Sequence, residues 1–304
     1  MRKSPVMLGP GTFALLLGAL TSCPFFTSGD YYTKDVSRAP VDAHSARYID
    51  SMVDAGDTGG FWAAADPVEF INIANAGTPR RRVLGKVAYH RFDTPYPWAD
   101  TFRIEPLSDA HAIVVDTRTC EVYESYQTAY ADGTLTAYSG AHWNLRRPFA
   151  PLPGGAPSAM ASGLSLFAGM IRWEEVQSGH IDHALNWEAP AGTVAQWDYV
   201  RPASDTDRLA FKGNSSYQLP YGAHLRLRAS FDLSHFGPQS RAIAMAMKRY
   251  GIFLADTGSD DNGLYNAMPL DGQNHWDAGD LAALRSIHIT DFEVLRLGSV
   301  SSVR

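Results

Sequence analysis

Ala223-His224-Leu225-Arg226-Leu227-Arg228-Ala229-Ser230-Phe231 is the stretch that most clearly predicts the fold. Apolar side chains occupy every second position, and histidine, arginine and serine fill the positions between them. Because successive side chains on a strand point to opposite faces, this alternation predicts a strand with one apolar and one polar face. Strands buried on one face only are typical of antiparallel sheets.

Similar short apolar or alternating runs recur along the chain. They cover Ala112–Val115, Glu121–Tyr126, Leu135–Trp143 and Ile181–Trp187. Thr117-Arg118 lies between the first two runs and predicts a turn that joins them as a hairpin. Together these runs predict a mainly β protein.

Helical patterns are few by comparison. Pro238 suits the first turn of a helix that ends at Gly251, and Asp277 and Asp280 suit the start of a helix over 281–286. A third helix is expected over 165–177, ending at Gly179. Because strands do not alternate regularly with helices, we expect an antiparallel β-sandwich or jelly roll with two or three short helices.

The N-terminus carries the pattern of an export signal. Arg2 and Lys3 precede an apolar run, Phe13–Leu20, which is shorter than the about 20 residues that a membrane helix needs. The run ends in Leu20-Thr21-Ser22-Cys23, the pattern before a lipidated cysteine in bacterial lipoproteins. We therefore predict a lipoprotein signal peptide over 1–22 and membrane anchoring through a lipid on Cys23. The alternative is an ordinary secretory signal followed by a chance cysteine.

Lipidation of Cys23 has consequences for location and for the other cysteine. The protein would lie outside the cytoplasm, and Pro24 in place of aspartate favours the outer membrane in a Gram-negative cell. Cys120 would be the one remaining thiol, so we expect no intramolecular disulfide and interpret Cys120 as a strand residue. Without Arg2 and Lys3 the chain has 24 basic and 32 acidic residues, which gives no indication of a nucleic-acid partner.

The composition also suggests where the folded part begins. Residues 23–60 contain few periodic apolar positions, and Gly, Ser, Asp and Thr recur up to Gly60. We predict a flexible tether over 23–60 and a single β-sandwich domain over 61–304.

Several blocks of the chain resemble an uncharacterised family of secreted bacterial proteins. The family skeleton is S-A-x-A-x-G, then E-V-x-x-G-x-I-x-H-A, R-x-x-A-x-F-D and Y-G-x-x-x-A-D, and the matching blocks here lie within 157–163, 172–185, 225–232 and 248–256. The resemblance implies extracellular residence and polysaccharide-rich surroundings, but no established activity. Met160 stands where the family pattern has an acidic residue, which puts any shared catalysis in doubt.

Carboxylates form the first group of candidate catalytic residues. Glycoside hydrolysis requires two carboxyl groups, one protonated and one ionised, on either side of one bond. We select Glu175, Asp182 and Asp256, with His183 as an acid–base group. The alternatives are a solvated helix face for Glu174 and Glu175 and a turn-forming role for Asp256.

The polar face of the 223–231 strand supplies candidate substrate-binding residues. His224, Arg226 and Arg228 could hold the carboxylates of a uronic acid and, with His183 and Tyr221, support β-elimination. The simpler alternative is a solvated outer face. Trp98 and Trp276, next to proline or in polar loops, are candidate exposed rings for stacking on sugars.

Other kinds of site are poorly supported. His180 and His183 lie three residues apart, which on a strand places them on opposite faces, so we predict no metal site and no cofactor. No Gly-x-Ser-x-Gly or phosphate-binding glycine motif occurs. We therefore expect a surface-anchored lipoprotein that acts on polysaccharide, as a glycoside hydrolase or polysaccharide lyase. The alternative is a non-catalytic glycan-binding protein or an envelope scaffold.

Overall fold

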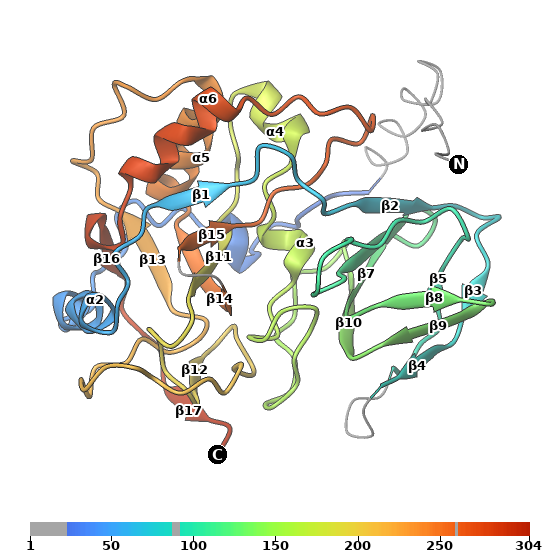
Figure 1. Cartoon of the computed structure of the whole chain (residues 1–304), viewed down its shortest axis with the longest axis horizontal. Coiled ribbons are helices and arrows are strands. Elements are labelled where there is room, and N and C mark those ends of the chain that lie inside the picture. The colour runs from blue at the N-terminus through green and yellow to red at the C-terminus, as the bar shows by residue number, and fades with distance from the viewer. Residues whose placement is uncertain (1–22, 87–91, 259–260) are drawn as a thin grey trace.

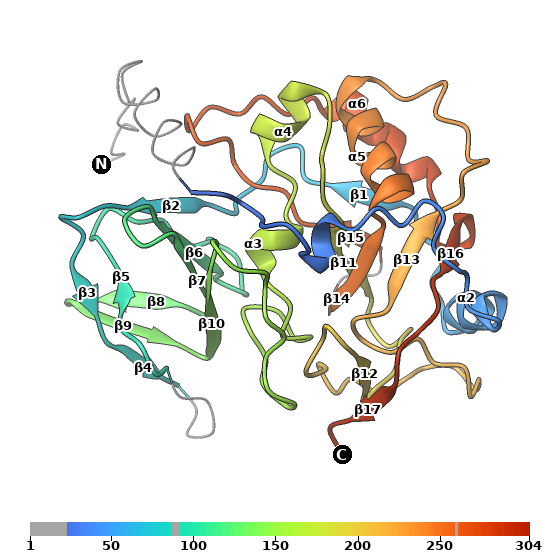
Figure 2. The same cartoon turned by 180° about the vertical axis from the view of Figure 1, so that it is seen from behind.

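The computed structural model describes residues 23–86, 92–258 and 261–304, and it consists mainly of strands in several sheets with few short helices. The expectation of a mainly β protein is therefore confirmed. Two lobes lie side by side in Figures 1 and 2, a larger one around β11, β13 and β14 and a smaller one formed by β2–β10. The predicted signal peptide, residues 1–22, lies outside the described residues. Within the described ranges, no helix has the length and apolar character required to cross a bilayer.

The larger lobe is built on a six-stranded sheet with the order β1-β15-β11-β14-β13-β16. Its strands are, in that order, Phe61–Ala63, Asn262–Leu264, Leu185–Pro190, Ile252–Gly258, His224–Leu227 and Phe292–Val294. The pairs β1/β15 and β11/β14 are parallel, and the other neighbours are antiparallel. The strand predicted over 223–231 is β13, but it ends at Leu227 because the chain turns at Arg228, whose carbonyl accepts the N–H of Phe231. The strand predicted over 181–187 begins only at Leu185.

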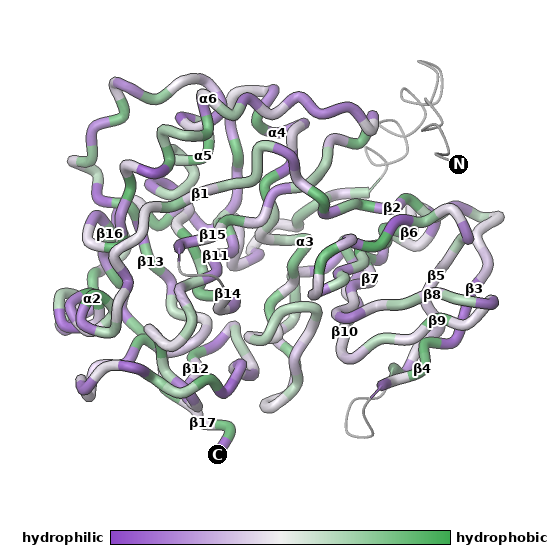
Figure 3. Tube along the Cα trace, in the orientation of Figure 1, coloured by the Kyte–Doolittle hydropathy of each residue, from purple (hydrophilic) through white to green (hydrophobic). Residues whose placement is uncertain are grey.

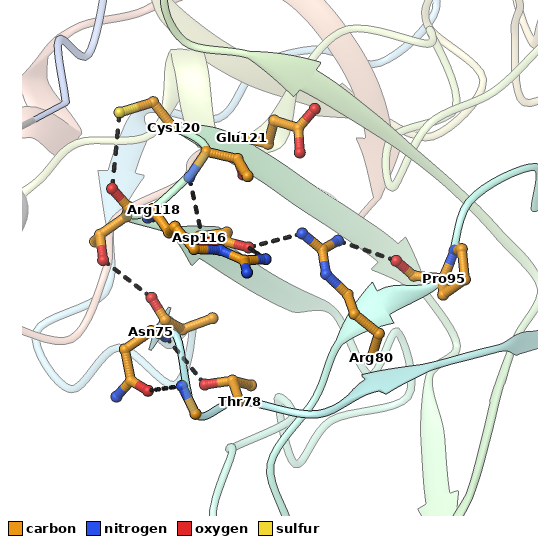
Figure 4. A network of polar contacts seen from close by, with 12 residues as sticks. Asn75, Thr78, Arg80, Pro95, Asp116, Arg118, Cys120 and Glu121 are labelled. Atoms are coloured by element: carbon orange, nitrogen blue, oxygen red, sulfur yellow. Dashed lines mark hydrogen bonds and ion pairs between the residues drawn. The ribbon is translucent and has the colours of Figure 1, made fainter.

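The smaller lobe contains a four-stranded sheet with the order β10-β7-β6-β2. These strands are Ser139–Asn144, Glu121–Tyr126, Ala112–Asp116 and Ile71–Ala74. The predicted hairpin is confirmed as β6 and β7. Asp116 holds its turn, since one carboxylate oxygen accepts the Arg118 N–H at 3.0 Å and the other pairs with Arg80 at 2.7 Å (Figure 4). Cys120 lies in this turn with φ +54°, so its interpretation as a strand residue is wrong.

Three short sheets complete the β structure. They are β12 (Asp198–Val200) with β17 (Val300–Ser302), β3 (Arg80–Arg81) with β5 (Tyr96–Pro97), and β4 (Val83–Gly85) with β9 (Thr134–Ala137) and β8 (Ala129–Ala131). The pairs β2/β6 and β4/β9 are parallel. Strand pairing is therefore mixed, although antiparallel pairs outnumber parallel ones among the described strands.

The helices are short and sit mostly on the larger lobe. They are η1 (Tyr31–Thr33), α2 (Ser45–Asp54), α3 (Leu166–Gly169), α4 (Trp173–Ser178), α5 (Pro238–Arg249), α6 (Ala278–Leu281), η2 (Ala282–Ser286) and η3 (Ile289–Asp291). The helix that begins at Pro238 is confirmed, as is the Asp277 cap, which accepts the N–H groups of residues 279 and 280. The helix expected over 165–177 is divided into α3 and α4, with Gly179 ending α4 at φ +87°.

Apolar side chains form three buried clusters. The first packs helices α2 and α5 against the six-stranded sheet, and the third fills the smaller lobe. The second lies between the lobes, where Val115 and Val122 of the four-stranded sheet pack in one cluster with Phe253 and Ala255 of β14. Helix α2 carries both hydrophobic and hydrophilic residues along its turns (Figure 3), and Met52 is one of those it buries. The two lobes are therefore held together by a shared core.

Residues 23–60 are packed against the rest of the protein, so the prediction of a flexible tether is wrong. Tyr32 is fully buried. Asp30 accepts the N–H of Tyr32 at 2.9 Å and that of Phe149 at 2.7 Å, and the N–H of Val36 donates to the carbonyl of Arg249 at 2.7 Å. The contacts with Phe149 and Arg249 are to distant parts of the chain, which is why local composition did not indicate them.

A disulfide joins Cys23 to Cys120, with their Cα atoms 5.4 Å apart. The expectation that no intramolecular disulfide forms is therefore wrong. The turn after β6 carries Cys120 to the place where the N-terminal segment starts, and Figure 4 shows that turn with Cys120 at its end. A sulfur atom in a disulfide has no valence left for a thioether-linked lipid. The disulfide and lipidation of Cys23 are therefore alternative states of the same residue.

Candidate functional site

A cavity of about 840 Å³ opens between the two large sheets, and we call it the main cavity. One wall comes from β11 and β14, and the opposite wall comes from the ends of β7 and β10 and the residues just before β6. The loops 155–161 and 205–209 complete the lining. Its volume falls in the range of about 300–1,000 Å³ that is usual for small-molecule sites.

Two carboxylates stand next to each other on the sheet wall. Glu188 on β11 and Asp256 on β14 are register partners in parallel strands, directly after a bulge that falls between Trp187 and Glu188. Before the bulge β11 is fully buried at Leu185 and Trp187, whereas Glu188 and Asp256 are only partly buried and line the main cavity. The bulge thus changes the register where the strands pass from the core to the cavity.

Asp256 is held by two backbone donors. One carboxylate oxygen accepts the Ala161 N–H at 2.8 Å and the other accepts the Thr257 N–H at 2.9 Å. Burial, together with the negative charges of Glu188 and Asp207, outweighs these hydrogen bonds and raises the pKa of Asp256 to about 7. At neutral pH, Asp256 is therefore divided between its protonated and ionised forms.

The other two carboxylates of this group accept hydrogen bonds from hydroxyls. The Tyr265 hydroxyl donates to Glu188 at 3.0 Å, and the Thr257 hydroxyl donates to Asp207. Asp205, in the same loop as Asp207, is instead paired with Arg208 at 2.7 Å. We call Glu188, Asp207 and Asp256 the open cluster.

A histidine lies on the opposite wall of the main cavity. The Nδ1 atom of His111 lies 2.8 Å from Glu105, which also accepts the His111 backbone N–H at 3.0 Å. Burial opposes the charge on His111, but the contact with Glu105 raises its pKa above the usual value. The Tyr126 and Tyr265 rings flank the imidazole. The main cavity therefore has a proton-carrying group on each wall.

This arrangement suits acid–base chemistry on a polar ligand. It combines a carboxyl that holds a proton near neutral pH, two further carboxylates beside it, and tyrosine rings that offer flat surfaces. In the described part of the chain, no group of three or more His, Cys, Asp or Glu side chains is arranged to hold a metal ion.

Of the four predicted catalytic residues, Asp256 alone lines the main cavity. Glu175 and His183 contact the buried Arg172, whose guanidinium lies 2.8 Å from Glu175 and 2.9 Å from the His183 ring. Burial opposes ionisation of Glu175, but Arg172 and His183 lower its pKa to about 2. We call Arg172, Glu175 and His183 the closed cluster. Asp182 is exposed and accepts a hydrogen bond from Tyr250, so it meets neither cluster.

The polar face of β13 is covered, so its predicted role as an open substrate-binding face is wrong. Arg226 is buried and donates to the carbonyl of Val36 at 2.6 Å and to Glu293 at 2.6 Å. His224 donates to the carbonyl of Tyr250 at 2.7 Å, and Arg228 is exposed. The N-terminal segment that packs here could not be foreseen from the alternation within residues 223–231.

The predicted stacking rings are also buried. Trp98 belongs to the core of the smaller lobe, and Trp276 packs against Trp173 while its indole N–H donates to the carbonyl of Ala267 at 3.0 Å. Neither lines the main cavity. Their expected exposure is therefore wrong, because neighbouring proline and polar residues do not show which way a ring points.

Sequence reasoning missed three residues of the site, Glu188, Asp207 and His111. Glu188 is a lone acid inside the apolar run 185–190, and His111 directly precedes the apolar strand β6. An isolated polar residue at the boundary of a buried strand was the signal available. Asp207 lies in a loop and had no comparable signal.

Met160 lines the main cavity. Its side chain is buried, and its sulfur lies 3.2 Å from the amide nitrogen of Asn186. Comparisons with models of known protein families, with curated proteins and with solved structures found no match to this chain.

Proposed function

We propose that this chain is an exported glycoside hydrolase that acts on polysaccharide in the main cavity. The observation that carries the proposal is the placement of Glu188 and Asp256 side by side on β11 and β14, facing a cavity large enough for sugar rings. The proposal requires two sheets that meet at a polar cavity; it does not require the jelly-roll or sandwich connectivity expected from the sequence.

Asp256 is assigned as the general acid and Glu188 as the nucleophile. Neighbouring strands lie about 4.8 Å apart, which is close to the about 5–5.5 Å between the carboxyl groups of retaining glycosidases. Asp256 gives its proton to the glycosidic oxygen while the Glu188 carboxylate bonds to the anomeric carbon and the C–O bond breaks. Ionised Asp256 then takes a proton from water, whose oxygen displaces Glu188. Asp207 contributes negative charge next to the developing oxocarbenium ion.

A polysaccharide lyase is less well supported. Arg226 on β13, which a lyase would use to bind a uronate, is covered by residues 36–39. The main cavity also has more carboxylates than cations. A non-catalytic glycan-binding or envelope-scaffold protein remains the second candidate, and Met160 favours it, because this position of the main cavity lacks the acid of the family skeleton.

Both possible states of Cys23, the disulfide and the lipidated cysteine, imply export from the cytoplasm. A disulfide persists in oxidising compartments, so the Cys23–Cys120 bond supports an exported protein released by an ordinary secretory signal. A lipid anchor on Cys23, with placement in the outer membrane of a Gram-negative cell, is the competing proposal. Intact-mass measurement of the exported chain separates the two, because each diacylglyceryl or acyl group adds several hundred daltons whereas a disulfide removes two hydrogens.

The activity test is a polysaccharide panel with a reducing-end assay, run on the full chain in its oxidised form. We expect hydrolysis of at least one polymer and a loss of about 10²–10⁴-fold in Asp256→Asn and in Glu188→Gln. Asp182→Asn is the matched control, since it removes an exposed carboxylate outside the main cavity. Activity that survives in both cavity variants would reject the assignment. Glycan binding without turnover would establish the second candidate.

A further inference from the structure

A second, smaller cavity of about 340 Å³ lies where the N-terminal segment crosses the larger lobe, and we call it the rear pocket. Figure 2 shows that segment passing in front of β14 and β13 towards α2. The lining comes from residues 31–40, 200–202 and 295–298, together with His224 on β13 and Phe253 on β14. The rear pocket forms only because residues 31–40 are packed in place.

The charged side chains around the rear pocket are all cations. They are Lys34, Arg201 and Arg296, and no carboxylate among the described residues lines it. Lys34 and Arg296 have no ion-pair partner in the described part of the chain, and Arg201 donates to the Leu152 carbonyl at 2.5 Å. Three cations around one small concavity raise the local concentration of anions.

Three carboxylates lie on or next to the segments that form the rear pocket, and two of them pair with arginines that do not line it. Asp35 pairs with Arg249 at 3.1 Å, and Glu293 pairs with Arg226 at 2.6 Å. Asp42 accepts the backbone N–H groups of His44 and Leu297. Arginines outside the rear pocket therefore balance Asp35 and Glu293, whereas Asp42 keeps its charge beside Leu297, and none of the three carboxylates lines the rear pocket.

The inner part of the rear pocket offers an acceptor and ring surfaces. The Tyr250 carbonyl can only accept, so Nε2 of His224 carries the hydrogen of their 2.7 Å bond. Burial and the charge of Lys34 lower the pKa of His224 to about 4, which leaves Nδ1 as an acceptor at neutral pH. The Phe253 ring stacks on this imidazole at 4.0 Å between centroids, and Tyr31 meets Phe253 edge-on.

We propose that the rear pocket binds one hexuronate unit, either as a free sugar acid or as the end of an acidic glycan. The carboxylate is held by Lys34, Arg201 and Arg296, a ring hydroxyl donates to Nδ1 of His224, and the C–H face of the sugar packs on the partly exposed Tyr31 ring. Ammonium and guanidinium groups together suit a carboxylate, and the volume suits one ring. This site is separate from the main cavity and does not depend on the proposed hydrolase activity.

Titration calorimetry of the full chain with sodium glucuronate, at low ionic strength, tests the proposal, with glucose as the neutral probe. We expect glucuronate to bind about tenfold or more tightly than glucose, and the Lys34→Gln/Arg296→Gln variant to lose about tenfold in affinity. Arg38→Gln is the matched control, because it removes an exposed cation of the same segment that does not line the rear pocket. Asp256→Asn should bind glucuronate as the wild type does.

Four outcomes would overturn the proposal. The first is equal binding of glucuronate and glucose, and the second is full affinity in the Lys34→Gln/Arg296→Gln variant. The third is binding of inorganic sulfate or phosphate as tight as that of glucuronate, which would assign the rear pocket to a free anion. The fourth is a loss of affinity in Arg38→Gln equal to that in the double variant, which would show that binding depends on general surface charge and not on the rear pocket.

Discussion

The closed and open clusters use the same kind of side chain in opposite ways. In the closed cluster, Glu175 lies 2.8 Å from a buried guanidinium, which lowers the pKa of the carboxyl to about 2. In the open cluster, burial and, to a smaller extent, the charges of Glu188 and Asp207 raise the pKa of Asp256 to about 7. A carboxylate paired with an internal cation supports the fold, whereas one placed among like charges can hand over a proton.

The largest expected effect comes from removing the cation of the closed cluster. Arg172→Met leaves Glu175 without its guanidinium partner and removes the guanidinium hydrogen bond to the Phe167 carbonyl. We expect the free energy of unfolding to fall by about 3–5 kcal/mol, measured by urea denaturation at pH 7. Arg228→Met, on an exposed side chain, should change it by less than about 0.5 kcal/mol. A similar small loss for Arg172→Met would show that the closed cluster does not support the fold.

The pH dependence of Glu175→Gln sharpens the comparison. A carboxyl whose folded pKa is lowered contributes stability above its unfolded pKa of about 4.5 and loses it as the pH falls towards 2. We expect the variant to be less stable than the wild type by on the order of 2 kcal/mol at pH 7. This difference should shrink steadily in unfolding curves taken from pH 5 down to pH 3. A difference independent of pH would mean that packing, and not charge, is what the glutamate supplies.

Asp256→Asn should show the opposite dependence on pH. Because the folded pKa of Asp256 is raised, the folded protein holds a proton that the unfolded chain has lost between about pH 4 and 7, so wild-type stability falls as the pH rises through that range. The variant lacks this penalty. Its stability relative to the wild type should therefore increase by about 2 kcal/mol between pH 4 and pH 8. An unchanged or falling relative stability would place Asp256 in the same class as Glu175.

The smallest effect is expected at Asp182, which belongs to neither cluster. Its carboxylate is exposed and contacts Tyr250 and His180 at the surface. Asp182→Asn should alter the free energy of unfolding by less than about 0.5 kcal/mol at any pH from 4 to 8. A larger change, followed by the same urea denaturation, would show that exposure alone does not separate inert carboxylates from the two clusters.

Local patterns predicted the local elements of this protein. The β6–β7 hairpin, helix α5 and the Asp277 cap each depend on neighbouring residues, and each was predicted. The cover over Arg226 and the burial of Tyr32 depend on residues 150 or more positions away, and alternation or composition carries no information on such contacts. The same limit applies to the candidate site, of which only one acidic residue was predicted. Asp256 was found through its block, but its partner Glu188 becomes a neighbour only when β11 and β14 pair.

The packing of the N-terminal segment sets an order of events during synthesis. Residues 30–36 are synthesised before their hydrogen-bond partners. The Val36 carbonyl accepts from Arg226, which lies 190 residues later, and the Val36 N–H donates to the carbonyl of Arg249. The first described part of the chain therefore cannot complete its packing until residue 249 has been made. Until then, the side chain of Tyr32 cannot be buried, and a chaperone that binds exposed apolar segments of nascent chains could bind here.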